Sequence, residues 1–474
     1  MTGATPRESD AASGAEAGEP RADGDAPRAD GVFSARFRWL SLGMFALVFL
    51  AAFETLAVTT VMPLIADDLD GWSLFAVAFA IPLAAGVVGM VIAGNWSDRG
   101  GPMAPLIASA IVWLIGVVIA GTATTMVVFV IGRFVHGFAG AAVIVPLYVI
   151  VARIYPERLR SRVFAGFAAA WVIPSIIGPT LAGLVAEATS WHWVFLGVAV
   201  LALPISVMVL MPLARARHEL AGDHDVPWSA SRILWSLLAA GAALGLGLAK
   251  DLGDPWRWIA APVAIVVVLI AVRPLLPPGT LSGRRGLPAT VLMRAIVAAA
   301  FFATEVYLPA FFRDTYEMRP SLAGAVLTGA GVSWAIASWL QGRLDRVPNT
   351  RIVRIGSGLL LVALVVVLGG SVFAWHPAIG FAAWTIAGFG MGFMYPRFSV
   401  AVLELSPKRE QGFNSSALTI GESLGASVSI AVTALVASAF AFDWYYPEFT
   451  VTVVVALVAL FVAGRVRPPG VPNG

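Results

Sequence analysis

Long apolar runs alternate with short polar segments from about residue 38 to residue 464. Each run is roughly 18–25 residues long, which is the length that a helix needs to cross a bilayer. The pattern predicts an all-α integral membrane protein with fourteen transmembrane helices. The approximate limits of the spans are 38–63, 72–95, 104–124, 127–152, 163–186, 192–212, 232–249, 256–276, 289–311, 321–342, 352–373, 377–400, 413–437 and 446–464.

Two polar segments divide these spans into groups of six, two and six. Ala214–Ser231 follows the sixth span, and a loop containing Arg284 and Arg285 follows the eighth. We therefore predict five regions. They are a disordered cytoplasmic tail at 1–36, a six-helix half at 37–213, loops with two additional transmembrane helices at 214–285, a second six-helix half at 286–467 and a cytoplasmic tail at 468–474.

A weak internal repeat supports two equivalent halves. Pro63 ends the first span and Asp98 follows 35 residues later, while Pro309 ends the ninth span and Asp345 follows 36 residues later. Parallel repeats are typical of transporters that bind substrate at the membrane midplane, between the halves.

The distribution of Lys and Arg predicts the topology. With a cytoplasmic N-terminus, 26 of the 31 basic residues fall on the inner side of the membrane. Merging the two central spans into one would move the later arginine clusters outside, against the positive-inside rule. We therefore expect fourteen spans with both termini in the cytoplasm.

Composition places the chain among polytopic membrane proteins. It is 59% hydrophobic and 12% charged, with a mean hydropathy of +0.85. The net charge of +3 is spread between apolar runs, so we expect no nucleic-acid partner. Cysteine is absent and the five histidines lack metal-ligand spacing, so we predict no metal and no cofactor. The excess of arginine over lysine favours a bacterial cytoplasmic membrane, in which the first apolar run stays as an uncleaved helix.

Glu54 is the single ionisable residue of the apolar run Ser41–Leu64. A carboxylate near the middle of a span costs roughly 2.5 kcal/mol or more on insertion scales, so it usually faces a water-filled cavity. There it can carry protons, ions or substrate. A structural hydrogen bond to a neighbouring helix is the alternative.

Three other ionisable residues inside spans are candidates for a functional role. Arg133 in the fourth span needs an acidic partner or a polar cavity, unless its side chain extends to the nearby membrane surface. Glu422, near the centre of the thirteenth span, can couple protons or serve helix packing. Glu305, in the outer half of the ninth span, is expected to face a cavity.

Two of the motifs are polar. The segment Gly94-Asn95-Trp96-Ser97-Asp98-Arg99-Gly100-Gly101 is similar to the signature G-x-L-a-D-R-x-G-R-K, although Trp96 replaces the usual leucine and the terminal basic pair is missing. A carboxylate and a guanidinium in this short loop could bond neighbouring helix ends in one conformation and release them in another. A plain hairpin turn is the alternative. Arg133, His136 and Gly137 are similar to R-x-x-Q-G, with histidine at the glutamine position.

Two further motifs complete the resemblance. The fifth span contains Gly166, Gly178-Pro179 and Gly183, similar to an antiporter signature that ends G-P-x-x-G-G. Glu54 and Pro63 match the pattern D-x-T-…-A-L-P, with glutamate in place of aspartate. Over residues 37–467 the chain thus resembles the major facilitator superfamily, and within it the fourteen-helix drug:proton antiporter branch.

The resemblance implies a monomeric, proton-coupled exporter of amphipathic or lipophilic small molecules, not an enzyme. It implies proton coupling through Glu54 and Arg133, a conformational-switch loop at Gly94, Asp98, Arg99 and Gly100, and antiporter packing at Gly166, Gly178, Pro179 and Gly183. Glu422 and Glu305 are added as proton-coupling candidates because they are carboxylates inside spans. Export of a specific lipid or metabolite and uncoupled facilitation remain alternatives. An intramembrane enzyme or a receptor is a remote one, because no cluster of nucleophile, base or metal ligands is found.

Aromatic residues in several spans are candidates for the wall of a drug cavity. Most intramembrane aromatics instead face lipid or the membrane surface. The candidates are Trp171, Trp334, Trp339, Trp384, Phe301 and Phe302.

Overall fold

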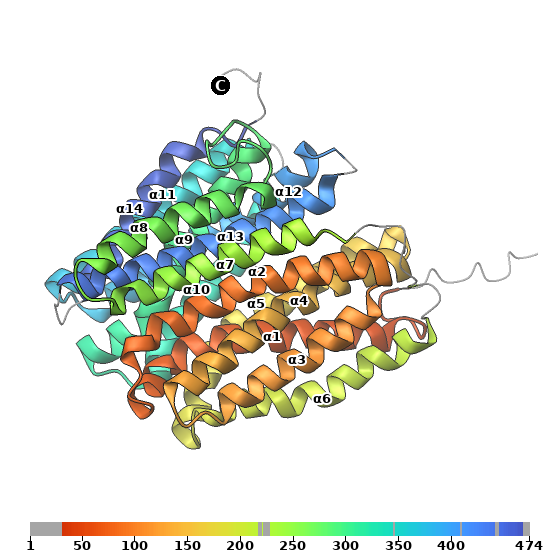
Figure 1. The fold of residues 1–474 in the computed structure, drawn as a ribbon, viewed down its shortest axis with the longest axis horizontal. Coiled ribbons are helices and arrows are strands. Elements are labelled where there is room, and N and C mark those ends of the chain that lie inside the picture. The colour runs from red at the N-terminus through yellow and green to blue at the C-terminus, as the bar shows by residue number, and fades with distance from the viewer. Residues whose placement is uncertain are drawn as a thin grey trace, which may run out of the picture.

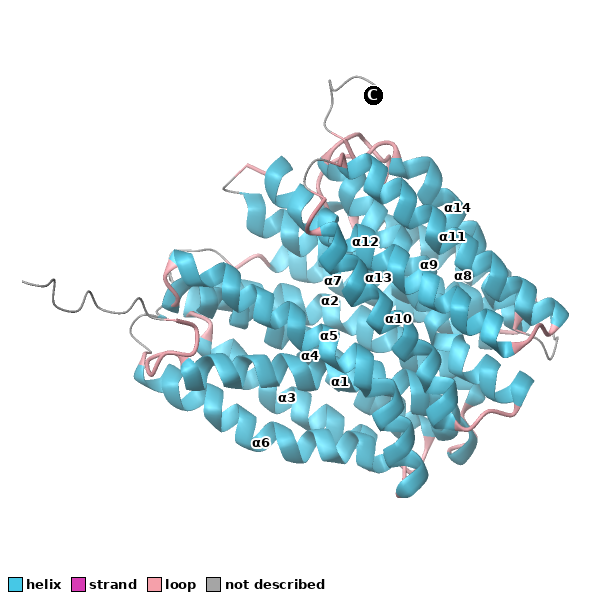
Figure 2. Cartoon of the chain, turned by 180° about the vertical axis from the view of Figure 1, so that it is seen from behind, coloured by secondary structure: helices cyan, strands magenta, loops and turns pink. Residues whose placement is uncertain are grey.

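The computed structural model describes residues 31–216, 220, 228–344, 347–407, 410–440 and 445–467. These residues form fourteen helices long and apolar enough to cross a membrane, and no strand (Figures 1 and 2). The helices are α1 (Arg38–Asp68), α2 (Phe75–Gly100), α3 (Met103–Gly121), α4 (Met126–Ile154), α5 (Glu157–Ala188), α6 (His192–Arg215), α7 (Ala230–Leu248), α8 (Trp256–Ala271), α9 (Leu287–Tyr316), α10 (Pro320–Gln341), α11 (Asn349–Phe373), α12 (Pro377–Leu405), α13 (Gln411–Phe440) and α14 (Tyr446–Ala463). Short 3₁₀ turns are η1 (Trp72–Leu74), η3 (Ala249–Asp251) and η4 (Arg273–Leu275).

Local signals set where several helices begin and end. Thr125 caps α4, its hydroxyl accepting a hydrogen bond from the Val128 amide at 3.3 Å. Proline occupies the first turn of α9, α10, α12 and α14, where its missing N–H costs nothing. Gly101 ends α2 with φ of 81°, a backbone conformation that glycine adopts without strain.

The sequence predicts a loop at Gly94–Gly101, but the structure shows that this prediction is wrong. α2 continues through Gly100, so Asp98 and Arg99 lie in its last turn and the chain turns only at Gly101. The polar residues of this segment favoured a loop, but helix geometry persists past the apolar stretch until glycine supplies the positive φ.

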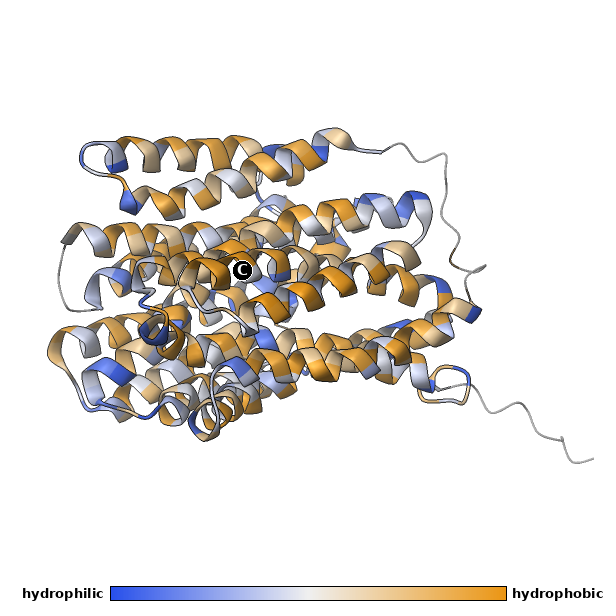
Figure 3. Ribbon diagram, turned by 60° about the horizontal axis from the view of Figure 1, so that its bottom comes forward, coloured by the Kyte–Doolittle hydropathy of each residue, from blue (hydrophilic) through white to orange (hydrophobic). Residues whose placement is uncertain are grey.

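Hydrophobic residues cover the middle of the helices, and polar residues gather toward the ends (Figure 3). We call the end of the bundle that holds residues 31–37 and 464–467 the terminal face, and the other end the opposite face. Helices α1–α6 form one half and α9–α14 the other. The halves meet mainly where α5 packs on α10 and α2 packs on α13.

The two additional helices lie beside this contact between the halves. α7 packs against both α2 and α13, and α8 packs against α7 (Figure 1). Gly247 of α7 marks the junction, because a Cβ there would lie 3.7 Å from Val77 of α2 and 3.9 Å from Ala431 of α13. The sequence indicated the pair but not this position.

Polar contacts join the halves near the opposite face. Asp67 at the end of α1 lies 2.6 Å from Arg313 of α9. Glu187 of α5 accepts a hydrogen bond of 2.8 Å from the Ser321 amide. This amide is in the first turn of α10, where the positive end of the helix dipole also stabilises a carboxylate. The passage between the two halves is therefore closed at this end of the bundle.

The tail expected to be disordered at 1–36 lies mostly outside the described residues, as does the one expected at 468–474. The last part of the N-terminal tail, residues 31–36, is ordered, so the expectation of disorder is wrong there. Val32 is buried and its carbonyl accepts a 2.8 Å hydrogen bond from the Ser41 hydroxyl, while Phe37 stacks on Tyr155. Burial of these apolar side chains offsets the entropy of ordering a polar segment.

The topology prediction can be tested directly. Reporter fusions after Arg467 and within the Ala214–Ser231 segment should both report the cytoplasm, because most arginines lie at the terminal face. A fusion within the α7–α8 connection at Leu252 should report the outside. An outside signal at the C-terminus would contradict the arrangement of six, two and six spans.

Candidate functional site

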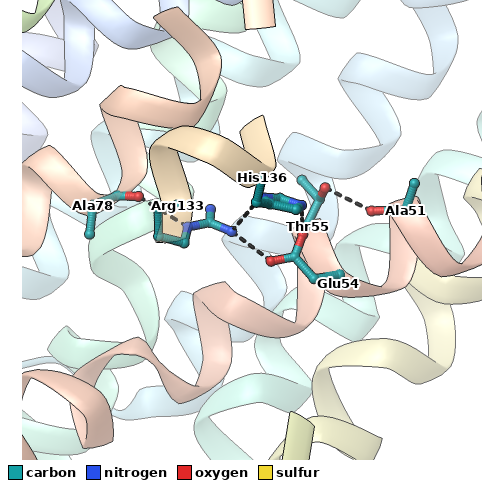
Figure 4. A network of polar contacts seen from close by, with 6 residues as sticks. All are labelled: Ala51, Glu54, Thr55, Ala78, Arg133 and His136. Carbon is teal, nitrogen blue, oxygen red and sulfur yellow. Dashed lines mark hydrogen bonds and ion pairs between the residues drawn. The ribbon is translucent and has the colours of Figure 1, made fainter. Parts of the chain in front are cut away.

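Glu54 lies at the centre of a buried ion cluster in the first half (Figure 4). Its side chain is 1% exposed, and its Oε1 accepts a 2.6 Å bond from Nη1 of Arg133 on α4. Arg133, itself 4% exposed, also donates from Nε to the Ala78 carbonyl of α2 at 3.2 Å. The predicted acidic partner of Arg133 is thus Glu54, and both charges are removed from water.

His136 completes the cluster, one helical turn after Arg133. Its Nε2 lies 2.6 Å from Oε2 of Glu54, and its Nδ1 lies 3.4 Å from Nη1 of Arg133. Since a guanidinium only donates, Nδ1 facing Arg133 fits an acceptor, which places the ring proton on Nε2 toward Glu54. The carboxylate therefore has the Arg133 guanidinium at one oxygen and the His136 ring nitrogen in close contact with the other.

Small residues allow α4 to bring these side chains together. A Cβ at Gly137 would lie 2.1 Å from the Cα of Pro82 on α2, and a Cβ at Gly116 of α3 would lie 2.3 Å from the His136 amide. Any larger side chain at either position would push α4 outward. The glycine that follows His136 in the motif is therefore a packing requirement.

A second ion cluster lies in the other half. Arg294 of α9 binds Oε2 of Glu422 through Nη2 at 2.7 Å and Nε at 2.8 Å. Its Nη1 donates to the Ser399 hydroxyl at 3.0 Å, and its guanidinium lies 4.0 Å from the ring centre of Tyr395. Arg294 was not among the residues predicted from the sequence. It stands seven residues inside a membrane span, the same signal that singled out Arg133.

The two clusters differ in their access to water. Side-chain exposure is 1% for Glu54 but 20% for Glu422 and 14% for Arg294. Tyr148 of α4 interacts electrostatically with Arg294 and Glu422 across the halves, yet is 48% exposed. The second cluster is therefore less buried than the first, and it lies in the part of the bundle nearer the terminal face.

Glu305 shows neither an ion pair nor a hydrogen bond to any described residue, and it is partly exposed. Helical spacing puts it on the same face of α9 as Phe301 and Phe302, one turn away. Glu305 thus lies apart from both ion clusters, and its expected position facing a cavity stays a prediction.

The aromatic candidates do not form one wall. Trp384 is fully buried inside the second half and stacks on Phe301, with 4.5 Å between the two ring centres. Trp334 packs edge-on against Phe301 at 5.6 Å, and Phe302 contacts the same ring at 5.4 Å. Trp171 and Trp339 are exposed. Trp384 and Phe301 are thus core residues, because flat rings fill the space between α9, α10 and α12.

The predicted conformational-switch residues lie at the end of α2. Asp98 and Arg99 are both exposed, and Asp98 interacts electrostatically with Arg153 and Arg232. A Cβ at Gly94 would lie 3.8 Å from the Val145 side chain, and a Cβ at Gly100 would lie 3.2 Å from the Trp96 ring. Asp345, the counterpart in the second half, lies outside the described residues.

Asp98→Asn should slow transport severalfold while leaving protein level and equilibrium substrate binding nearly unchanged. The substitution removes the charge that faces Arg153 and Arg232 but keeps the shape of an exposed side chain. Transport rates and membrane protein levels measure the two effects. Loss of folded protein would instead support a purely structural role for the turn.

The antiporter motif lies along both contacts of α5. A Cβ at Gly166 would lie 2.4 Å from the Phe45 ring of α1. Toward the opposite face, a Cβ at Gly183 would lie 2.7 Å from the Cα of Ser321 on α10, and the Pro179 carbonyl approaches Gly324. A Cβ at Gly178 would have more room, at 3.5 Å from the Phe53 ring. The motif therefore fits α5 between its own half and the other half.

Comparison with known proteins identifies the family. The sequence model of the Major Facilitator Superfamily matches residues 44–430 and 290–474. The chain belongs to the Major Facilitator Superfamily. As a member it is a membrane transporter, and its fourteen helices, motifs and two halves agree with that assignment.

Two curated relatives are named for multidrug resistance or multidrug efflux. "Multidrug resistance protein 3" of Bacillus subtilis (strain 168) is 24% identical over 418 residues, covering 83% of this chain and 78% of the relative. "Multidrug efflux pump SdrM" of Staphylococcus aureus (strain N315) is 22% identical over 408 residues, covering 82% of this chain and 88% of the relative.

A solved structure shares the fold. The crystal structure of a D-xylose-proton symporter matches with a TM-score of 0.66 at 13% identity, covering 90% of this chain and 98% of that chain. The family and this match confirm the predicted all-helical major facilitator fold.

Proposed function

We propose that this transporter exports amphipathic or lipophilic small molecules in exchange for protons, by alternating access across a bacterial cytoplasmic membrane. The observation that carries the proposal is the buried cluster of Glu54, Arg133 and His136. The names of the two bacterial relatives support the class of substrate.

The cluster suits proton exchange because a dry carboxylate must be neutralised. In this conformation Arg133 neutralises Glu54, and a proton bound to Glu54 would do the same while releasing the guanidinium. His136 can pass or hold that proton, since its Nε2 already touches Oε2. Each proton bound or lost therefore changes the contact between α1 and α4.

Alternating access links this change to substrate. Glu54 is 1% exposed and would be shielded from solvent protons in this conformation, while Glu422 is 20% exposed. If the termini are cytoplasmic, the closed opposite face is the outer face and this conformation opens inward. Glu54 would then meet external protons after the halves rock the other way.

Purified protein in liposomes tests the proposal. Under an imposed pH gradient, a panel of amphipathic compounds should include some that drive proton movement and accumulate against their own gradient. A pH-sensitive dye inside the vesicles reads the proton flux. If the transport of every compound in the panel is independent of the pH gradient, antiport is contradicted and uncoupled facilitation is favoured.

A further inference from the structure

A pocket of about 400 Å³ opens at the opposite face, away from both ion clusters. It lies between α9, α13 and α14 of the second half, the start of α2 and the turn η3 that follows α7. The α7–η3 segment thus contributes to its wall. The residues that give the pocket its chemistry are Trp72, Lys250, Tyr307, Asp314, Tyr445 and Glu448.

Two of its three charged residues already have partners. Lys250 donates to the Ser73 carbonyl and lies 3.2 Å from Asp251. Asp314 accepts a 2.8 Å bond from Nε of Arg313 and a second bond from the Tyr445 hydroxyl. These charges are compensated within the protein.

Glu448 is different. It is 8% exposed, and its Oε2 has no hydrogen-bond partner among the described residues. It stands in the first turn of α14 and lines the pocket together with Tyr307 and Tyr445, whose hydroxyl groups it influences electrostatically. A buried carboxylate with a free oxygen costs free energy unless something binds it.

We propose that this pocket binds an organic monocation, such as a substituted ammonium or phosphonium, with Glu448 as its counter-ion. Aromatic side chains with one uncompensated carboxylate are the surroundings that such cations prefer. Trp72, Phe75, Tyr307 and Tyr445 supply the aromatic part. The volume also falls in the range of roughly 300–1,000 Å³ for small-molecule sites.

This site is separate from the proposed proton exchange. Glu54, Arg133 and His136 belong to the first half, whereas Glu448 is on the last helix of the second. Binding at the pocket can therefore be measured at equilibrium, whether or not export is coupled to protons.

The absence of cysteine permits a local test, because an introduced thiol is the only one in the chain. Ser438→Cys places a thiol on the pocket wall, and Thr122→Cys places one at the exposed α3–α4 turn of the same face. Protein in lipid nanodiscs is treated with a trimethylammonium methanethiosulfonate or with its sulfonate analogue. The ratio of the two modification rates is compared between variants.

The ratio should favour the cationic reagent at least about tenfold more in Ser438→Cys than in Thr122→Cys, since an uncompensated charge nearby is worth on the order of one decade. Tetraethylammonium should slow modification of Ser438→Cys only. Adding Glu448→Gln should lower the ratio to that of Thr122→Cys, and Glu448→Asp should preserve most of it. Glu317→Gln, an exposed acid outside the pocket, is the matched control and should change nothing.

Equal ratios in the two cysteine variants, or a high ratio that survives Glu448→Gln, would overturn the proposal. If Ser438→Cys is not folded, Ala437→Cys reports on the same wall. Protection by tetraethylammonium could also depend on Glu54 instead of Glu448. If Glu54→Gln removes the protection and Glu448→Gln does not, the cation binds elsewhere and the proposal is rejected.

Discussion

Glu54→Gln should abolish export driven by a pH gradient, leaving substrate at equal concentrations on both sides of the membrane. Glutamine keeps the shape and hydrogen-bonding capacity of the side chain but does not titrate. Its amide oxygen can still accept the bond from Arg133, so the contact between α1 and α4 remains possible. Downhill exchange of substrate should therefore survive. Uphill accumulation and counterflow in liposomes measure the two activities separately.

Glu422→Gln is the matched control for this experiment. It removes the equivalent carboxylate from the second cluster, where Arg294 is the partner. If Glu54→Gln still pumps with normal pH dependence and Glu422→Gln does not, coupling resides in the second half. If both variants pump normally, Glu305 becomes the next carboxylate to neutralise.

Arg133→Gln should destabilise the folded protein by about 3–5 kcal/mol, the cost of leaving a buried charge without its partner. Glu54 is 1% exposed, so water cannot replace the guanidinium, and His136 would be its remaining partner. The free energy of unfolding in mixed micelles measures the effect at neutral pH. Transport should be lost as well.

The double variant Glu54→Gln with Arg133→Gln distinguishes charge from packing. Removing both charges leaves two amides of suitable length, so most of the lost stability should return while pH-driven export stays absent. Arg257→Gln, which breaks the surface ion pair between Arg257 and Asp254, serves as a control. Its partner Asp254 is 62% exposed, and the change should cost less than about 1 kcal/mol. A double variant as unstable as Arg133→Gln alone would show that the cluster acts through shape rather than charge.

Hydropathy and charge were enough to predict several features of this protein. The fourteen spans follow from bilayer thickness, which imposes a minimum length on every apolar run. Glu54 and Arg133 stood out because an ionisable side chain in a membrane span is costly without a partner or a cavity. Both signals are local, so a single sequence contains them.

Tertiary structure decided which residues meet. Glu54 and Arg133 are 79 residues apart, and Arg294 and Glu422 are 128 apart, so no local pattern pairs them. The same holds for Glu448, whose neighbours come from α9, α13 and the turn after α7. Even the end of α2 depended on one glycine rather than on the polarity of the segment. Periodicity fixes how long each helix must be, whereas the approach of one helix to another depends on small residues such as Gly137 at contacts far apart in the chain.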